Sequence, residues 1–181
     1  MRQRYSIATL PVTPWKNGGG QTREIVSLPA GSAIFHWRAS IATLRQSGAF
    51  STFPGIDRII TLIRGAEATL HHNGHTQRLA LGVPYAFSGD EMTHCQMGGG
   101  EGLDFNLMIR RGHCRATVSL IAEAASSRAG VCLVMAGQWR VAGETLEQDE
   151  GMWWSGEESD VTPLSPDARL LFAPVVECGQ P

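Results

Sequence analysis

Apolar and polar residues alternate with a period of two along much of this chain, and Gly and Pro interrupt the alternation at short intervals. A period of two places successive side chains on opposite faces, which is typical of β-strands. The expected strands are Arg4–Leu10, Thr22–Leu28, Phe35–Leu44, Arg58–Ile63, Glu67–His72, Thr76–Leu81 and Leu103–Arg110. At most one short helix is expected, around Ala122–Ala129. The pattern predicts a β-rich chain.

Two of these strands carry polar residues on one face only. In Phe35–Leu44, Arg38 shares a face with Ser40. In Leu103–Arg110, Asp104 and Asn106 share a face because they are two residues apart.

The strand and turn pattern occurs twice. Thr61–Glu91 contains a strand, Gly65, a second strand, the turn Asn73-Gly74 and an aromatic strand, and Cys132–Glu158 repeats this order with Gly137. Asn-Gly is a strong hairpin signal because both residues tolerate positive φ. The repeat predicts two similar β-units: residues 1–112, and residues 113–181 as a degenerate copy packed on the first.

Composition narrows the function classes. The chain has 181 residues, 43% of them hydrophobic and 18% charged, with a formal net charge of −2. No basic run or global positive field would attract nucleic acid. No apolar segment approaches the roughly 18 residues of a membrane span, and Pro11 and Pro14 interrupt the N-terminal stretch, so no signal peptide is expected. We expect a cytoplasmic protein that binds neither nucleic acid nor membrane, with homo-oligomers left open.

The hairpin pattern resembles the cupin fold, a small jelly-roll β-barrel. Metal-binding cupins place a His-x-His pair and a Glu before the first glycine of the pattern and a further His after the second. Here Arg58 stands where the Glu would fall, Ser51–Pro54 contains no histidine, and His94 alone lies near a ligand position. A fixed positive charge would repel a metal and attract an anion. His71, His72 and His75 lie at the hairpin turn, where a solvated loop is the ordinary explanation. We therefore expect no metal and no cofactor.

Four motifs occur in order: WKNGGGQTREI, FHWRASIATL, GAFSTFPGIDRIITLIRG and DFNLMIRR. Together they closely resemble the HutD/Ves family. The resemblance implies an all-β bicupin with two stacked jelly-roll-like barrels or sandwiches, and no established enzyme activity. It also implies either a role in histidine utilisation, sensing an intermediate such as urocanate or formylglutamate, or a Ves-like role in stress responses.

The first motif suggests part of a binding site. Three consecutive glycines can present N–H groups to an anion, and Lys16 and Asn17 beside them could address a carboxylate. The alternative is a flexible turn or bulge between strands.

The later motifs supply further candidates, each with a structural alternative. Arg58 could face the barrel interior and bind a carboxylate bidentately, or form an ion pair with Asp57 at a strand edge. Arg38 could act in the same way or face solvent. Asp104 and Asn106 could contact ligand N–H groups or form a structural network. Phe53 and Phe87 are expected apolar walls, or ordinary core residues.

These residues favour non-enzymatic binding of a small carboxylate metabolite. The alternative is a small-molecule enzyme such as a metal-free isomerase, for which His94 is the candidate base, and no catalytic residue is assigned. A third hypothesis is an interaction protein with a vestigial barrel.

Overall fold

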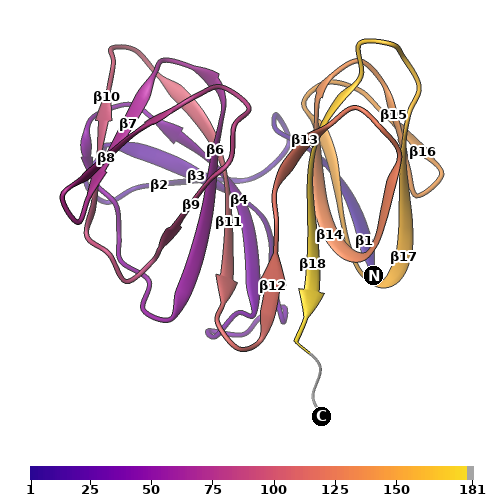
Figure 1. Ribbon diagram of the computed structural model, residues 1–181, viewed down its shortest axis with the longest axis horizontal. Coiled ribbons are helices and arrows are strands. Elements are labelled where there is room, and N and C mark those ends of the chain that lie inside the picture. Colours follow the sequence, from indigo (N-terminus) through magenta and orange to yellow (C-terminus); the bar gives the residue numbers. More distant parts are fainter. Residues whose placement is uncertain (179–181) are drawn as a thin grey trace. The chain divides into compact units, whose positions relative to one another are not determined.

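A computed structural model describes residues 1–178, which contain eighteen β-strands and no helix. The strands form two compact units (Figure 1). The first unit comprises residues 11–112, and the second comprises residues 1–10 together with 113–181. The chain therefore divides at residue 112, and the first ten residues group with the second unit. Within residues 1–178 no helix is long and apolar enough to cross a membrane.

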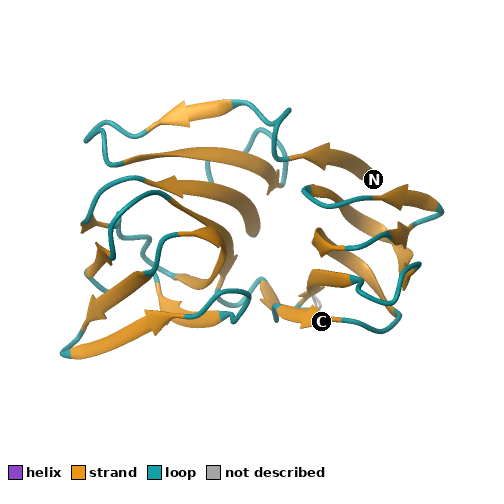
Figure 2. Ribbon diagram, turned by 90° about the horizontal axis from the view of Figure 1, so that it is seen from above, coloured by secondary structure: helices purple, strands orange, loops and turns teal. Residues whose placement is uncertain are grey.

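The first unit contains two antiparallel sheets. The six-stranded sheet has the order β2 (Val12–Pro14), β3 (Gly20–Leu28), β4 (Trp37–Leu44), β11 (Gly102–Arg110), β6 (Ile56–Gly65) and β9 (Tyr85–Ser88). The four-stranded sheet has the order β5 (Gly48–Ala49), β10 (Thr93–Met97), β7 (Ala68–His72) and β8 (His75–Leu79). Figure 2 shows the strands of this unit curving around a shared interior.

Apolar residues from both sheets form one core in the first unit. Leu44, Ile60 and Leu62 come from the six-stranded sheet, and Leu70 and Leu79 come from the four-stranded sheet. All five are at most 3% exposed. Their burial holds the two sheets face to face, since apolar contact is the main favourable term in such packing. The face of β4, β6 and β11 that carries this core is called the inner face below.

The second unit is built on a single eight-stranded sheet. Its main path runs β12 (Cys114–Ala116), β18 (Arg169–Glu177), β14 (Ala125–Ala136), β17 (Glu150–Pro163), β15 (Trp139–Val141) and β16 (Glu144–Leu146). Off this path, β1 (Arg2–Ser6) pairs with β17, and β13 (Ser119–Ile121) pairs with β18. Its core includes Trp139 and Trp154, which are both fully buried.

The expected hairpin is present in the first unit. β7 and β8 pair antiparallel with His72 opposite His75, and the two turn residues between them have positive φ, 48° at Asn73 and 74° at Gly74. These angles are those of the hairpin turn that Asn-Gly favours. The second unit has the same turn at Ala142 and Gly143, with φ values of 48° and 87°.

The expected helix around Ala122–Ala129 is wrong. Part of this segment belongs to β14, where Ala125 and Ser126 pair with Val161 and Asp160 of β17. Alanine has the highest helix propensity of all residues, but intrinsic propensity is a weak preference that pairing with a neighbouring strand overrides.

Candidate functional site

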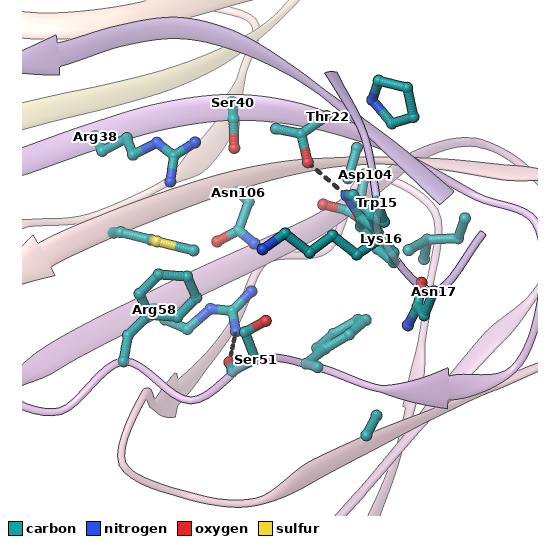
Figure 3. A pocket seen from close by; sticks show the side chains of 17 residues that line it. Trp15, Lys16, Asn17, Thr22, Arg38, Ser40, Ser51, Arg58, Asp104 and Asn106 are labelled. Carbon is teal, nitrogen blue, oxygen red and sulfur yellow. Dashed lines mark hydrogen bonds between the residues drawn. The ribbon is translucent and has the colours of Figure 1, made fainter. Parts of the chain in front are cut away.

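The first unit encloses a cavity of about 420 Å³. Its wall combines the inner face of the six-stranded sheet with two loop segments (Figure 3). The lining residues are Pro14, Trp15, Lys16, Asn17, Thr22, Arg38, Ser40, Ala42, Leu44, Ala49, Phe50, Ser51, Phe53, Arg58, Asp104, Asn106 and Met108. Seven of the eight candidate residues are among them, and the exception is Phe87.

The strand register explains why the polar residues converge. Met108 of β11 lies opposite Arg38 of β4 on one side and opposite Arg58 of β6 on the other. Directly opposite residues of antiparallel strands point to the same face. Two residues along β11, Asn106 lies opposite Ser40, and Asp104 follows two residues further. The cavity wall thus changes from cationic to acceptor-rich along β11, as Figure 3 shows.

Arg58 is the buried cation of this wall, with only 5% of its surface exposed. Its guanidinium carbon lies 5.3 Å, 5.4 Å and 4.9 Å from the ring centroids of Phe50, Phe53 and Phe87. Nη1 donates one long hydrogen bond of 3.4 Å to the Ser51 carbonyl, and Nε has no hydrogen-bond partner. The aromatic faces stabilise the cation without using its N–H donors.

Burial lowers the pKa of Arg58 to about 10, while the charge of Asp104 opposes this shift and that of Arg38 adds to it. The guanidinium remains protonated at neutral pH because this pKa is well above 7. Arg58 therefore presents a positive charge and free donors to the cavity.

Asp104 is the acid of the same wall and is 1% exposed. Burial raises its pKa to about 7, against the opposing effect of the Arg58 charge. Its Oδ1 has no hydrogen-bond partner, and neither has Oδ1 of Asn106, a residue that is 6% exposed. Both oxygens are therefore buried acceptors without a donor.

Arg38 lines the cavity and forms an ion pair at the same time. Its Nε lies 2.8 Å from Oε2 of Glu24, and its side chain is 26% exposed. Of the two alternatives for Arg38, the structure has the inward-facing one: its side chain lines the cavity and is partly buried.

The glycine run is a tight turn and does not form an anion nest. The Gly18 N–H donates to the Trp15 carbonyl at 3.1 Å, and the Gly19 N–H donates to Oδ1 of Asn17 at 2.9 Å. A Cβ at Gly20 would lie 2.3 Å from the Thr43 carbonyl oxygen, so only glycine fits there. The run instead positions Lys16 and Asn17, which line the cavity.

Phe87 is placed differently from the expectation. It lies opposite Arg58 in the β6–β9 pair and packs on the guanidinium, but it does not line the cavity. Phe53 does line it. The lining residues that were not candidates are Pro14, Trp15, Thr22, Ser40, Ala42, Leu44, Ala49, Phe50, Ser51 and Met108. Alternation could have found Ser40 and Met108, which share their faces with candidates; the loop residues Phe50 and Ser51 carry no such signal.

The histidines do not contribute to this cavity. His94 is exposed on β10 and does not line it, so the candidate base is not in the pocket. His72 is buried, contrary to the expectation of a solvated loop. Its Nδ1 lies 2.5 Å from Oε2 of Glu91, and its Nε2 lies 2.7 Å from the Tyr85 hydroxyl.

The cavity does not fit a metal ion. Among residues 1–178, no three His, Cys, Asp or Glu residues are grouped as a metal site would require. The cavity lining offers one carboxylate, Asp104, and no imidazole or thiol. Transition metals in proteins are held by several such donors, and two guanidinium groups in the same wall would repel a cation.

A β-sandwich unit followed by a second unit with the same strand and turn order is the architecture of cupin-like proteins. Solved structures agree with this class. Protein Ylba from Escherichia coli has a TM-score of 0.75 at 11% identity, covering 99% of this chain and 92% of its own, which shows the fold alone.

The HutD family profile matches residues 7–172, and the chain belongs to the HutD family. It is similar to Protein Ves of Citrobacter koseri, with 37% identity over 94% of this chain and 92% of that protein. It is also similar to the structure of HutD from Pseudomonas fluorescens SBW25 (formate condition), with a TM-score of 0.85 and 31% identity, covering 99% of this chain and 100% of that one. A conserved protein of unknown function from Pseudomonas aeruginosa PAO1 has a TM-score of 0.84 at 25% identity, covering 97% of this chain and 98% of its own.

Proposed function

We propose that the first unit binds a small carboxylate-bearing metabolite, with Arg58 as the anchor of the carboxylate. The observation that carries this proposal is a buried guanidinium whose charge is held by three aromatic rings and whose Nε has no partner. Burying a polar group without a hydrogen bond is unfavourable, and an arginine fork matches a carboxylate in shape and charge.

The charge of the cavity wall supports the same ligand class. Arg38, Arg58 and Lys16 are cationic, and Asp104 is the single acid among the lining residues. The wall therefore carries a net positive charge at neutral pH, and this charge is larger because burial raises the pKa of Asp104 to about 7. An anion placed beside Arg58 would balance this charge.

The size of the cavity favours a small molecule. Its volume of about 420 Å³ is at the lower end of the range of small-molecule sites. Candidate acids are urocanate and N-formylglutamate, which would give the protein a sensing or buffering role in histidine utilisation. A Ves-like role in stress responses would use the same cavity for another acid.

Isothermal titration calorimetry with urocanate, N-formylglutamate and formate tests this proposal. We expect Arg58→Met to weaken binding by roughly 10- to 100-fold, because it removes charged hydrogen bonds while keeping an apolar side chain against the aromatic rings. Arg110→Met is the matched control: Arg110 lies on β11 over the Phe35 ring, 5.7 Å from its centroid, and does not line the cavity.

Circular dichroism would confirm that both variants are folded. An unchanged Kd in Arg58→Met, or the absence of binding of any of these acids to the wild-type protein, would contradict the proposal.

A further inference from the structure

Two acceptor oxygens lie side by side on the cavity wall without a donor. Asp104 and Asn106 are two residues apart on β11, both line the cavity, and they are 1% and 6% exposed. Oδ1 of each residue makes no hydrogen bond. Lys16, which Figure 3 shows extending into the cavity, does not bond to either oxygen. The protein therefore leaves two adjacent buried acceptors open to the cavity.

Such a pair is unfavourable in the empty protein. An unsatisfied buried acceptor costs roughly 1–3 kcal/mol, and well over 90% of buried polar groups in proteins have partners. Unpaired groups that persist in a cavity wall are typical of a site whose ligand supplies the missing hydrogen bonds.

The oxygens are separated along β11 from the two arginines of the cavity. Arg38 and Arg58 lie opposite Met108, which is two residues from Asn106 along β11. Since a strand rises about 3.3 Å per residue, the backbone at Met108 is roughly 7 Å from that at Asn106 and roughly 13 Å from that at Asp104. One small molecule can contact both ends if its two polar groups are several bonds apart.

We propose that Asp104 and Asn106 form a second subsite that accepts an N–H donor of the ligand, so that the cavity selects acids that carry an N–H group several bonds from the carboxylate. This inference rests on the proposed function, because it takes the carboxylate to lie at Arg58. Amido acids and imidazolyl acids satisfy both ends. A carboxylate bound at this subsite would place an anion against two acceptor oxygens, and a simple aliphatic acid would leave both oxygens unpaired.

Two pairs of isosteric probes test the subsite by calorimetry on the wild-type protein. Urocanate and 3-(2-furyl)acrylate share the acrylate chain, but the furan has no N–H group. 4-Acetamidobutanoate and 6-oxoheptanoate differ only by N–H in place of CH₂. We expect the N–H member of each binding pair to bind at least tenfold more tightly, since a site built to hydrogen-bond a group rejects analogues that lack it.

Variants assign the effect to these two residues. Asn106→Leu and Asp104→Leu should each reduce the affinity ratio within a pair to roughly threefold or less. Arg110→Met, which changes a residue of the same strand that does not line the cavity, should leave the ratio unchanged. Where a leucine variant fails to fold, the wild-type ratios alone decide.

The outcomes distinguish the two proposals. Equal affinity within both pairs, or tighter binding of the analogues without N–H, would overturn the donor subsite while leaving the carboxylate site in place. If none of the four acids binds, the proposed function and this inference are both wrong.

Discussion

Arg58 and Asp104 share one buried wall, and burial shifts their pKa values in opposite directions. The pKa of Arg58 falls to about 10 and that of Asp104 rises to about 7, while the charge of each residue opposes the shift of the other. Arg58 keeps its charge at neutral pH because aromatic faces surround it, and Asp104 becomes protonated just below neutral pH. The ionisation of Asp104 therefore changes the size of the positive charge of the cavity wall but not its sign.

The raised pKa of Asp104 predicts a pH-dependent stability. Between about pH 4 and pH 7 the folded protein retains a proton at Asp104 that the unfolded chain has released, so the free energy of unfolding falls as pH rises through this window. The slope for one proton is about 1.4 kcal/mol per pH unit. Asp104→Asn cannot titrate, so it should gain stability relative to wild type as pH rises from 5 to 8.

Urea denaturation at pH 5, 6, 7 and 8 measures this difference, because groups that titrate in both proteins cancel. Asp167→Asn, an exposed acid between β17 and β18, is the control and should follow wild type. A constant stability difference between Asp104→Asn and wild type across the four pH values would contradict the prediction.

The alternation of polar and apolar residues predicted which side chains of a single strand share a face of the candidate site, but not which strands lie side by side. A period of two placed Arg38 on one strand face and Asp104 with Asn106 on another, and these faces do line one cavity. The meeting of Arg38 and Arg58 across Met108 could not be predicted, because it depends on the register between strands far apart in the sequence. The same holds for Phe87, whose position over Arg58 is fixed only by the β6–β9 pairing.

At the scale of elements, the two units share a sequence of turns. Gly65 and Gly137 each end the first strand of the repeat with positive φ, 89° and 67°. The Gly82 N–H donates to the Leu62 carbonyl at 2.8 Å, and the Asp149 N–H donates to the Val134 carbonyl at 3.1 Å. Gly65 and Gly137, which the sequence repeat had matched, therefore occupy equivalent turns.

One equivalence could not be found from residue types. Gly82 corresponds in backbone geometry to Asp149, with φ values of 73° and 69°. Aspartate tolerates the left-handed region better than most residues, so a glycine is not required at this turn. A pattern based on glycines misses such a replacement.

The hairpin of the second unit carries a strained residue. Ala142 has a φ of 48° where the first unit has Asn73 with the same φ. A left-handed conformation costs an ordinary residue about 1 kcal/mol, and glycine has no such penalty. We expect Ala142→Gly to raise the free energy of unfolding by roughly 0.5–1 kcal/mol, measured by urea denaturation.

The first hairpin offers the reciprocal variant. Asn73→Ala places the same strain at the corresponding turn and should lower stability by a similar amount. If Ala142→Gly destabilises the protein, the lost methyl contact with the core around Trp139 outweighs the relief of strain, and the prediction is wrong.

At the scale of the whole chain, the two units share a strand order but differ in the residues of their interiors. β14 pairs with β18 in the second unit as β6 pairs with β11 in the first. β17 takes the positions of both β9 and β10, because it pairs with β14 and with β15. With Gly65 matched to Gly137, the positions of Arg58, Asp104 and Asn106 correspond to Gly130, Leu170 and Phe172.

The second interior is correspondingly apolar. Leu170 and Phe172 belong to its core, and the Trp154 ring stacks on Phe172 with centroids 6.2 Å apart. A Cβ at Gly130 would lie 3.2 Å from the Trp154 ring, so a large side chain like Arg58 has no room there. The residues of the proposed carboxylate site therefore have no polar counterparts at the matching positions.

The first strand of the chain belongs to the second unit. β1 pairs with β17 from Arg2 opposite Trp154 to Ser6 opposite Glu150. Local pattern identifies a strand here, but the choice of partner depends on contacts between residues about 150 positions apart, as in the Arg4–Glu150 ion pair.

Tyr5 connects this first strand to the core of the second unit. Its hydroxyl donates to the Cys132 carbonyl at 2.8 Å, and its side chain is 7% exposed. A Cβ at Gly151 would lie 2.4 Å from the Tyr5 ring, so the ring occupies the space above that glycine. Tyr5→Ala should therefore lower the free energy of unfolding by about 3–5 kcal/mol, whereas Tyr5→Phe should cost about 1 kcal/mol through the lost hydrogen bond.

Denaturation gives the size of the effect, and hydrogen exchange locates it. In Tyr5→Ala the loss of amide protection should be greatest in β1 and β17. The Tyr5 side chain anchors β1 on the core of the second unit, and the pairing of β1 with β17 depends on that anchor. Gln3→Ala, an exposed position of β1, should change neither measurement. Protection of β17 that survives in Tyr5→Ala would mean that β1 is an accessory strand, and that residues 113–181 fold without it.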